Sequence, residues 1–248
     1  MAVCKSPVFV LRCQDWSESS QVVHLLAREA GRLRCLAKGS ARGKNPFGGP
    51  LDRWTLGEAV FSLRDPTHLA TLMEVYETER FEGLRERLPA YFGACYITEL
   101  VTALVPDADP QPGLFDLVVE AMRVLAAAEA EACQAVTLAA AWRILGVLGY
   151  GPDMGRCTEC GGALEVGAEA AFDVGLGGPV CAVCRPKATG VLPLGAKAAK
   201  AVTFLAQAAW DDVERVRLSK PTAAQMRAVL AARIAELAGR PLSAARYV

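Results

Sequence analysis

Histidine is scarce in this chain, and the common signatures of nucleotide-dependent and hydrolytic enzymes are missing. Only two histidines occur in 248 residues, His24 in a strand-like segment and His68 near a turn, and neither has a nucleophile or metal ligand beside it. There is no Walker loop, no G-x-G-x-x-G after a strand and no G-x-S-x-G elbow. These absences give no support for the use of ATP or of a small-molecule substrate.

Long apolar runs are missing as well. The N-terminal run PVFVL is cut short before Arg12, so it lacks the length of the apolar region in a secretory signal. The longest charge-free runs, such as residues 132–142, are far shorter than the roughly 18 apolar residues of a membrane span. The sequence predicts a soluble, cytoplasmic protein with no membrane partner.

An excess of either charge is also absent, although the signs are unevenly distributed. The formal net charge is zero. Residues 1–73 hold ten Lys and Arg against six Asp and Glu, residues 185–248 hold eleven against four, and residues 74–131 hold four against twelve. This pattern is compatible with two positive surfaces around an acidic body, or with ordinary solvated faces. The carboxylates of the middle segment indicate a solvated face rather than a catalytic metal site.

Residues 7–80 contain five segments with β-branched or aromatic residues and partial alternation of apolar and polar positions. The segments are PVFVLRCQDW, SQVVHLLARE, GRLRCLAKGS, WTLGEAVFSLR and HLATLMEVYETE. They predict a small five-stranded β-barrel domain over residues 1–80. A tract rich in Gly and Pro, GSARGKNPFGGP, joins the third segment to the fourth, and a long flexible connection inside a compact barrel is more often functional than accidental.

The apolar period becomes helical after about residue 82, and the overall class is α+β. Helices are predicted from Pro89 to about Val105, around residues 114–125 and 138–148, over 196–210, and from Thr222 to Gly239. Thr222 is expected to cap the last helix, with Gln225 completing a capping box. We expect a helical bundle in two parts, residues 81–152 and 191–248, on either side of an insertion over residues 153–190.

Four cysteines lie in that insertion, in the stretch CTECGGALEVGAEAAFDVGLGGPVCAVC. Cys157 and Cys160 are separated by two residues, as are Cys181 and Cys184, and twenty residues separate the pairs. This spacing matches a two-knuckle zinc finger, in which four thiolates fill a tetrahedral site and leave no position for catalysis. We expect one structural zinc ion; reversible disulfides and a redox motif are the alternatives.

The other five cysteines lie in apolar or strand-like contexts, where a thiol behaves as a small hydrophobic side chain. They are Cys4, Cys13, Cys35, Cys95 and Cys133. An odd total of nine cysteines fits a reducing compartment better than a disulfide framework.

A basic stretch begins at Arg28 and contains a single acidic residue, Glu29. Period two places Arg32, Arg34 and Lys38 on one face of the third strand, so a barrel could present a basic track that continues into the loop. The residues expected to bind nucleic-acid phosphates are Arg32, Arg34, Lys38, Arg42, Lys44 and Arg53. The nearest aromatics for base stacking are Phe47, Trp54 and Phe61, and because they are few, charge is expected to outweigh stacking.

The chain resembles the bacterial DNA repair and recombination mediator family RecO. The likeness lies in VLRCQDWSESSQVVHLLAREAGRLRCLAKGSAR, the helix ELVTALVP, the knuckle FDVGLGGPVCAVC and the C-terminal RPLSAARYV, so it covers essentially the whole chain. It implies an N-terminal OB-fold, a helical domain with an inserted zinc finger, and no enzymatic turnover. The four-cysteine segment occurs in only part of the family.

The resemblance further implies binding of single- and double-stranded DNA, annealing of complementary strands, and loading of RecA, together with RecR, onto DNA covered by single-strand binding protein. RecF is a further candidate partner, and the protein is expected on the bacterial nucleoid when bound to DNA. From charge alone, the acidic tail of single-strand binding protein is expected to dock on Arg215, Arg217, Arg227 and Arg233. Two other classes stay open: a zinc-stabilised adaptor for an acidic protein partner, and a thiol oxidoreductase.

Overall fold

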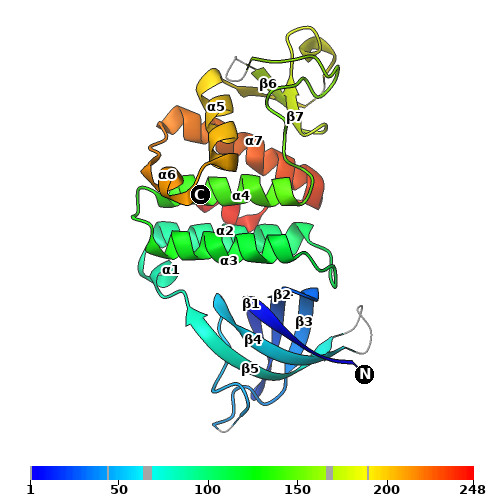
Figure 1. Ribbon diagram of the computed structural model, residues 1–248, viewed down its shortest axis with the longest axis vertical. Helices are drawn as coiled ribbons and strands as arrows, with labels where there is room; N and C mark the ends of the chain where they lie inside the picture. The colour runs from blue at the N-terminus through cyan, green and yellow to red at the C-terminus, as the bar shows by residue number, and fades with distance from the viewer. Residues whose placement is uncertain (1, 44, 64–68, 166–169, 189) are drawn as a thin grey trace. The chain divides into compact units, whose positions relative to one another are not determined.

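The computed structural model describes residues 2–43, 45–63, 69–165, 170–188 and 190–248 (Figure 1). The chain divides into two compact units, one of Met1–Glu82 with Leu104–Glu120 and one of Gly83–Ala103 with Ala121–Val248. This division differs from the predicted domains, because residues 104–120 group with the strands rather than with the helices. None of the described helices is both long enough and apolar enough to cross a lipid bilayer.

The first unit is built on a closed barrel of five strands. They are β1 (Ala2–Ser17), β2 (Ser20–Ala27), β3 (Gly31–Ala37), β4 (Thr55–Leu63) and β5 (Ala70–Arg80). Their order around the barrel is β1-β2-β3-β5-β4, with β4 pairing back onto β1 and with β3 and β5 parallel. The closed five-stranded barrel agrees with the predicted OB-fold and leaves no open sheet edge.

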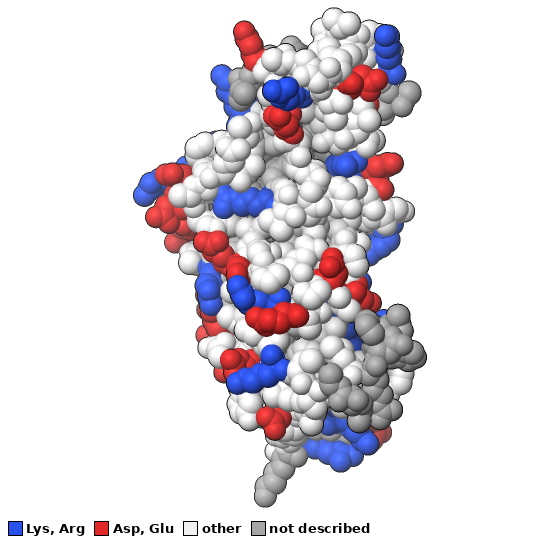
Figure 2. All heavy atoms as spheres, turned by 45° about the vertical axis from the view of Figure 1, so that its right-hand side comes forward, with Lys and Arg blue, Asp and Glu red and all other residues white. Residues whose placement is uncertain are grey.

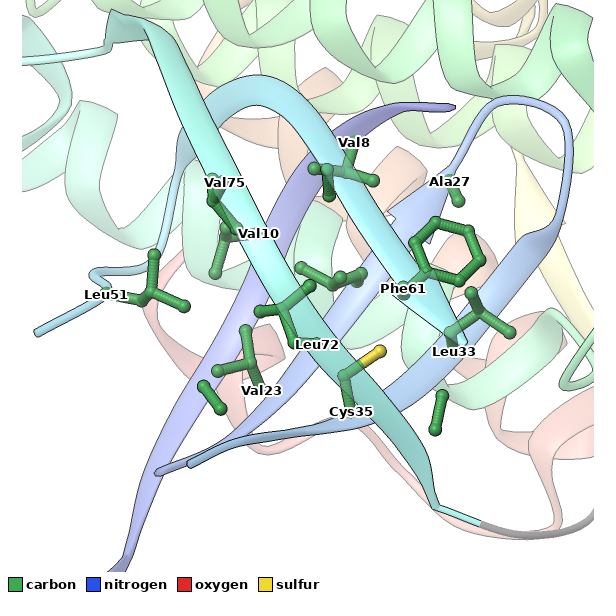
Figure 3. Close-up of a cluster of buried hydrophobic side chains, with 14 residues drawn as sticks. Val8, Val10, Val23, Ala27, Leu33, Cys35, Leu51, Phe61, Leu72 and Val75 are labelled. Carbon is green, nitrogen blue, oxygen red and sulfur yellow. The ribbon is translucent and has the colours of Figure 1, made fainter. Parts of the chain in front are cut away.

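Alternating residues of the strands point into the barrel and fill it with apolar side chains (Figure 3). On β3 the inward residues Leu33, Cys35 and Ala37 are buried, while Arg34 between them is exposed. The predicted alternation of this strand is therefore confirmed. Each fully buried Val, Leu or Phe contributes about 1.5–3 kcal/mol through the area that it removes from water.

The Gly- and Pro-rich connection between β3 and β4 is held against the barrel by Gln21, which is buried. The side-chain amide of Gln21 donates to the carbonyl of Leu51 at 3.2 Å, and its oxygen accepts from the Leu51 amide at 2.9 Å and from the Ser40 hydroxyl at 3.0 Å. Phe47 and Leu51 pack against the barrel core. The described part of this connection is thus a packed cover for the barrel, not the flexible loop that its composition predicts.

The second unit is helical. Its elements are α1 (Gly83–Glu86), α2 (Leu88–Leu104), α3 (Pro112–Ala127), α4 (Cys133–Val147), α5 (Ala196–Gln207), α6 (Trp210–Arg215), α7 (Lys220–Ala238) and a terminal 3-10 helix (Ser243–Tyr247), with α3 beginning in the first unit. The helix α4 is apolar almost all round and is buried along most of its length, as expected for a central helix. These helices agree with the predicted bundle.

Close packing around α4 depends on two residues. At Gly93 of α2, an added Cβ would lie 2.3 Å from the hydroxyl of Thr137 on α4, so only glycine permits this approach. Arg143 of α4 donates to the carbonyl of Leu205 at 2.9 Å and lies over the ring of Trp210, 3.9 Å from its centroid. Arg143 thereby fixes the corner between α5 and α6.

The ends of α7 are set by local chemistry, and the predicted N-cap is wrong. Ser219, not Thr222, is the N-cap, because its hydroxyl accepts from the backbone amide of Thr222 and the helix begins at Lys220. Pro221 lies in the first turn, where a missing amide hydrogen costs nothing. The predicted end is confirmed: Gly239 adopts a left-handed conformation with φ of 69°.

Glu99 of α2 anchors the C-terminal segment, and its removal should loosen that segment. The carboxylate accepts from the amides of Ser243 and Ala244, both at 2.8 Å, and from Arg240 at 3.4 Å. Burial alone would raise the pKa of Glu99, but these donors outweigh burial and hold the pKa below its ordinary value of 4.5. The stabilisation is therefore present above pH 4.5 and is lost as the pH falls through the lower, folded-state pKa.

We expect Glu99→Gln to lower the free energy of unfolding at pH 7 by about 2 kcal/mol, the range of a hydrogen-bond set to a charged group. The variant should also lose less stability than the parent protein between pH 5 and pH 3, measured by urea unfolding. Glu120→Gln, an exposed glutamate of α3, is the control and should change neither quantity. Equal acid sensitivity of Glu99→Gln and the parent would contradict this account.

Candidate nucleic-acid interface and metal centre

A row of basic side chains crosses three strands on the outside of the barrel. The strand register places Arg12 of β1 opposite His24 of β2, and His24 opposite Arg34 of β3. The neighbouring row is Gln14, Val22 and Leu36. We name the barrel face the surface formed by Arg12, Gln14, Val22, His24, Arg34 and Lys38. OB-folds use the face of the second and third strands for oligonucleotides, so this row lies on the corresponding side.

The arginines around His24 act on its ionisation. Burial and the guanidinium groups of Arg12, Arg32 and Arg34 lower the pKa of His24, against an opposing effect of Asp107. His24 is therefore neutral at pH 7, and the positive charge of the row comes from the arginines on either side of it. Nδ1 of His24 is buried and forms no hydrogen bond with any residue that the structure describes.

Asp107 neutralises part of the basic track that the sequence predicts. Its carboxylate lies 2.9 Å from the guanidinium of Arg32 and 3.7 Å from that of Arg34. The Arg32 side chain is only 17 % exposed, whereas that of Arg34 is 51 % exposed. Arg32 therefore has a largely structural position, and Arg34 keeps access to solvent. Arg28, at the start of the basic stretch, forms a two-pronged pair with Asp116, at 2.9 Å for both contacts.

The remaining predicted phosphate ligands lie in different settings. Lys38 and Arg42 are exposed, at and just after the end of β3. Arg53 is half-buried, with its guanidinium 4.5 Å from the centroid of the Trp54 ring. Lys44 lies outside the residues that the structure describes, as does His68. Figure 2 shows Lys and Arg interspersed with Asp and Glu on the face that it presents, so this view does not separate the two signs into large patches.

The aromatics expected near this track are not available for stacking. Trp54 and Phe61 are fully buried, and Phe47 packs against the barrel core. Another aromatic residue, not predicted from the sequence, is available: Trp16 is 68 % exposed near the end of β1. Trp16 has no partner in the strand register, because β1 has one more residue than β2 between the pairs Asp15–Gln21 and Ser17–Ser20. Such a bulge redirects a side chain, and alternation alone does not reveal it.

The four cysteines of the insertion come together in the second unit. The sulfur atoms of Cys157, Cys160, Cys181 and Cys184 all lie within 4.8 Å of one another. Cys160 and Cys181 are 4.0 Å apart between their sulfur atoms, near the edge of about 3.8 Å that bonds of 2.3 Å give in a tetrahedral thiolate site. No disulfide joins any of the nine cysteines, all of which are described. This arrangement could hold a metal ion.

The chemistry of the thiols fits a cation at their centre. Burial opposes ionisation of Cys157, but the backbone amides of Cys160, Cys181 and Glu159 outweigh burial and lower the pKa of this thiol. The pKa of Cys184 is raised instead, first by hydrogen bonding to Cys181 and then by burial and the other sulfurs. Four thiolates at this spacing repel one another, so a cation is what allows them to ionise together.

A small sheet surrounds the cysteine cluster. It consists of β6 (Ala170–Asp173), β7 (Gly178–Val180) and β8 (Val191–Leu194) in the order β7-β6-β8. Because β8 pairs with β6, the sheet extends past the predicted end of the insertion at residue 190. We name residues 153–194 the finger. Among its described residues, one buried cluster consists of Cys157, Ala171, Val180 and Cys184, two of which are candidate metal ligands.

Arg233 of α7 binds the backbone of the finger and is too buried to contact a partner. Only 9 % of this residue is exposed, and its guanidinium donates to the carbonyls of Val174 and Gly175 at 3.0 and 2.9 Å. The charge-based assignment of Arg233 to a docking surface is therefore wrong, since a buried charge needs such partners. Arg215 and Arg217 are exposed and Arg227 is half-buried. Of these, Arg215 pairs with Asp212 at 3.3 Å.

The closed barrel, the helical unit and the four-cysteine finger together define the class: an OB-fold protein with a helical second part that carries a candidate structural metal site. Residues 1–80 match the family description Recombination protein O N terminal, and residues 85–245 match Recombination protein O C terminal. The chain belongs to the RecO family.

Three relatives, matched over 74–96 % of this chain, support this conclusion. The chain is similar to the DNA repair protein RecO of Anaeromyxobacter dehalogenans, with 33 % identity over 96 % of this chain and 93 % of that protein. It is similar to the DNA repair protein RecO of Rhodopirellula baltica, with 36 % identity over 84 % of this chain and 72 % of the relative. It is also similar to the DNA repair protein RecO of Pelotomaculum thermopropionicum, with 34 % identity over 74 % of this chain and 69 % of the relative.

Proposed function

We propose that the chain is a non-catalytic recombination mediator that binds single- and double-stranded DNA through the barrel face and anneals complementary strands. With RecR, it promotes loading of RecA onto DNA covered by single-strand binding protein in the bacterial cytoplasm. The observation that carries DNA binding is the row Arg12, His24, Arg34 on the outside of an OB-fold barrel in a chain of the RecO family. RecR, RecF and single-strand binding protein are proposed partners on the family likeness alone.

The form of the barrel face supports phosphate binding. Arg12, Lys38 and Arg42 are exposed, and Arg34 keeps half of its side chain in solvent despite Asp107. Guanidinium and ammonium groups release counterions from DNA when they neutralise phosphates, so affinity is expected to fall steeply with salt. The proposed set of phosphate ligands is Arg12, Arg34, Lys38 and Arg42, to which Lys44 and Arg53 are added from the sequence.

The test removes the four charges at once. In a variant with Arg12, Arg34, Lys38 and Arg42 all changed to Ala, the slope of log affinity against log salt for a single-stranded oligonucleotide should become less negative by about 3, at about 0.7 per contact. Lys5→Ala is the matched control, because Lys5 lies on β1 of the same barrel but pairs with Glu58 on the β4 side. It should leave affinity and slope unchanged.

Asp107→Asn should change the affinity for DNA in the opposite direction. It removes the carboxylate that competes for Arg32 and Arg34, so affinity for the same oligonucleotide should rise by several fold at low salt. Unchanged affinity and slope in the four-residue variant would remove DNA binding from the barrel face. Such a result would favour the alternative function, an adaptor whose basic residues receive an acidic protein.

We further propose that the cysteine cluster holds one zinc ion in a structural role. The geometry and the thiol chemistry support a four-thiolate site, and such a site has no open position for water or substrate. Cys157, Cys160, Cys181 and Cys184 would be the ligands, and the ion would hold the finger in shape. Elemental analysis of purified protein separates this function from a thiol oxidoreductase, which would contain no stoichiometric metal.

A further inference from the structure

A hollow opens on the barrel face beside the basic row. Its volume is about 530 Å³, within the range of roughly 300–1,000 Å³ that is typical of ligand pockets. Trp16 and Leu69 supply apolar walls, and Val22, Gln14, His24 and Arg34 also line it. All these residues belong to the first unit. The hollow therefore combines a large aromatic surface with hydrogen-bonding side chains and the positive charge of Arg34, which also contacts Asp107.

Trp16 is the feature that needs an explanation. Of the four tryptophans in the chain, Trp54, Trp142 and Trp210 are buried, with at most 9 % exposed, while Trp16 is 68 % exposed. Leaving this much aromatic surface in water forgoes the favourable free energy that burial would provide. The β1 bulge directs Trp16 to the same hollow that Leu69, also 41 % exposed, helps to form.

The polar groups of the hollow suit a planar, uncharged occupant. Gln14 offers both a donor and an acceptor, and neutral His24, whose Nδ1 is buried, offers one of the two through Nε2, as the edge of a nucleobase requires. Asp15 also lines the hollow, and its carboxylate repels a phosphate from the interior. A phosphate is favoured instead beside Arg34. An aromatic wall with this distribution of charge is the form of a base-stacking platform.

We infer that the hollow binds one unstacked nucleobase of single-stranded DNA on the ring of Trp16, while Arg34 contacts an adjacent phosphate. This inference rests on the proposed function, because it assigns a base site to the same barrel face. Bases inside a duplex are stacked on their neighbours and do not reach the hollow. The site therefore contributes to single-strand affinity and not to duplex affinity.

The experiment measures binding of a short oligonucleotide in three forms: single-stranded, duplex, and a strand of equal length without bases. Trp16→Ala should weaken single-strand binding by about 5- to 150-fold, the effect of one base–aromatic stack. It should leave binding of the duplex and of the base-free strand unchanged. Trp16→Phe keeps a smaller ring and should lose less affinity than Trp16→Ala.

Fluorescence supplies a direct readout of contact. Because Trp16 is the one strongly exposed tryptophan of the four, stacking of a base on it should quench part of the protein emission when the single strand binds. The base-free strand should cause no quenching, and Trp16→Phe should abolish the quenching by the normal strand. An unchanged thermal unfolding transition of Trp16→Ala shows that a loss of affinity is not a loss of folding.

The outcomes separate this inference from the proposed function. If Trp16→Ala and the parent bind single strands equally while the four-residue charge variant loses affinity, the base site is wrong and phosphate binding by the barrel face stands. If base-free and normal strands bind the parent equally, the base site is also wrong. If the parent binds no DNA at low salt, the proposed function fails and the base site fails with it.

Discussion

Cys157→Ser is expected to release the metal from the finger and to unfold residues 153–194. The reason is the small size of the cluster around the cysteines: in the described part of the finger it has four buried residues, two of them candidate ligands, with Leu164, Cys181, Ala188 and Val191 partly buried against them. A core of this size cannot offset the conformational entropy of the chain around it, so the free energy of metal binding does so, at about 10–16 kcal/mol for structural zinc sites at pH 7. This is the largest effect that we expect from any single substitution.

The measurement is zinc content per chain together with the rate of proteolysis within the finger. The parent should contain one zinc ion and resist cleavage, and Cys157→Ser should contain less metal and be cleaved rapidly. Cys4→Ser changes a half-buried cysteine of β1 outside the cluster and should retain the ion. If chelation of the parent left the rate of cleavage unchanged, the finger would be stable without metal and the structural role would be wrong.

Gly31→Ala is expected to destabilise the first unit by about 3 kcal/mol, since it combines two costs. Gly31 joins β2 to β3 with φ of +70°, a left-handed conformation that side chains disfavour. An added Cβ would also lie 2.3 Å from the backbone oxygen of Asp109, and backbone cannot move aside as a side chain does. The segment next to it carries Asp107, so the variant should also loosen the pairing of Asp107 with Arg32.

Substitutions at two other glycines allow the cost of the backbone conformation and the cost of the close contact to be measured separately. Gly48 has φ of +72° and no atom within 4 Å of an added Cβ, so Gly48→Ala measures the backbone strain alone. Gly43 has open space and no left-handed conformation, so Gly43→Ala should be neutral or slightly stabilising. Urea unfolding of the three variants should give Gly31→Ala the largest loss of free energy. Equal losses for Gly31→Ala and Gly48→Ala would contradict the close approach of Asp109.

Local patterns in the sequence were sufficient for the elements of the fold. Alternation along β3 predicts that the Arg34 side chain faces solvent. The apolar stripe of α7 predicts that helix, and Gly239 predicts where it ends. The spacing of the cysteines predicts that their sulfur atoms meet. Each of these depends on residues that are near in sequence or on a motif with a fixed geometry.

Contacts between distant segments were not predictable in this way. Asp107 reaches Arg32 and Arg34 across more than seventy residues of sequence, and charge counts alone place it on an acidic surface. Arg233 appears in the sequence as one more basic residue of a helix, yet its guanidinium is buried against the finger. The exposure of Trp16 follows from a single extra residue in β1, which alternation does not register.

The contact of Asp107 with Arg34 has a consequence for how quickly a strand bound as proposed above would leave. A phosphate on Arg34 would displace this carboxylate without removing it, because the 2.9 Å pair with Arg32 keeps Asp107 beside the Arg34 guanidinium at a high effective concentration. The Asp107 carboxylate would pair with Arg34 again whenever the phosphate dissociates, and this competition would shorten the residence time of the strand. Competition of this kind would favour rapid exchange of the bound strand.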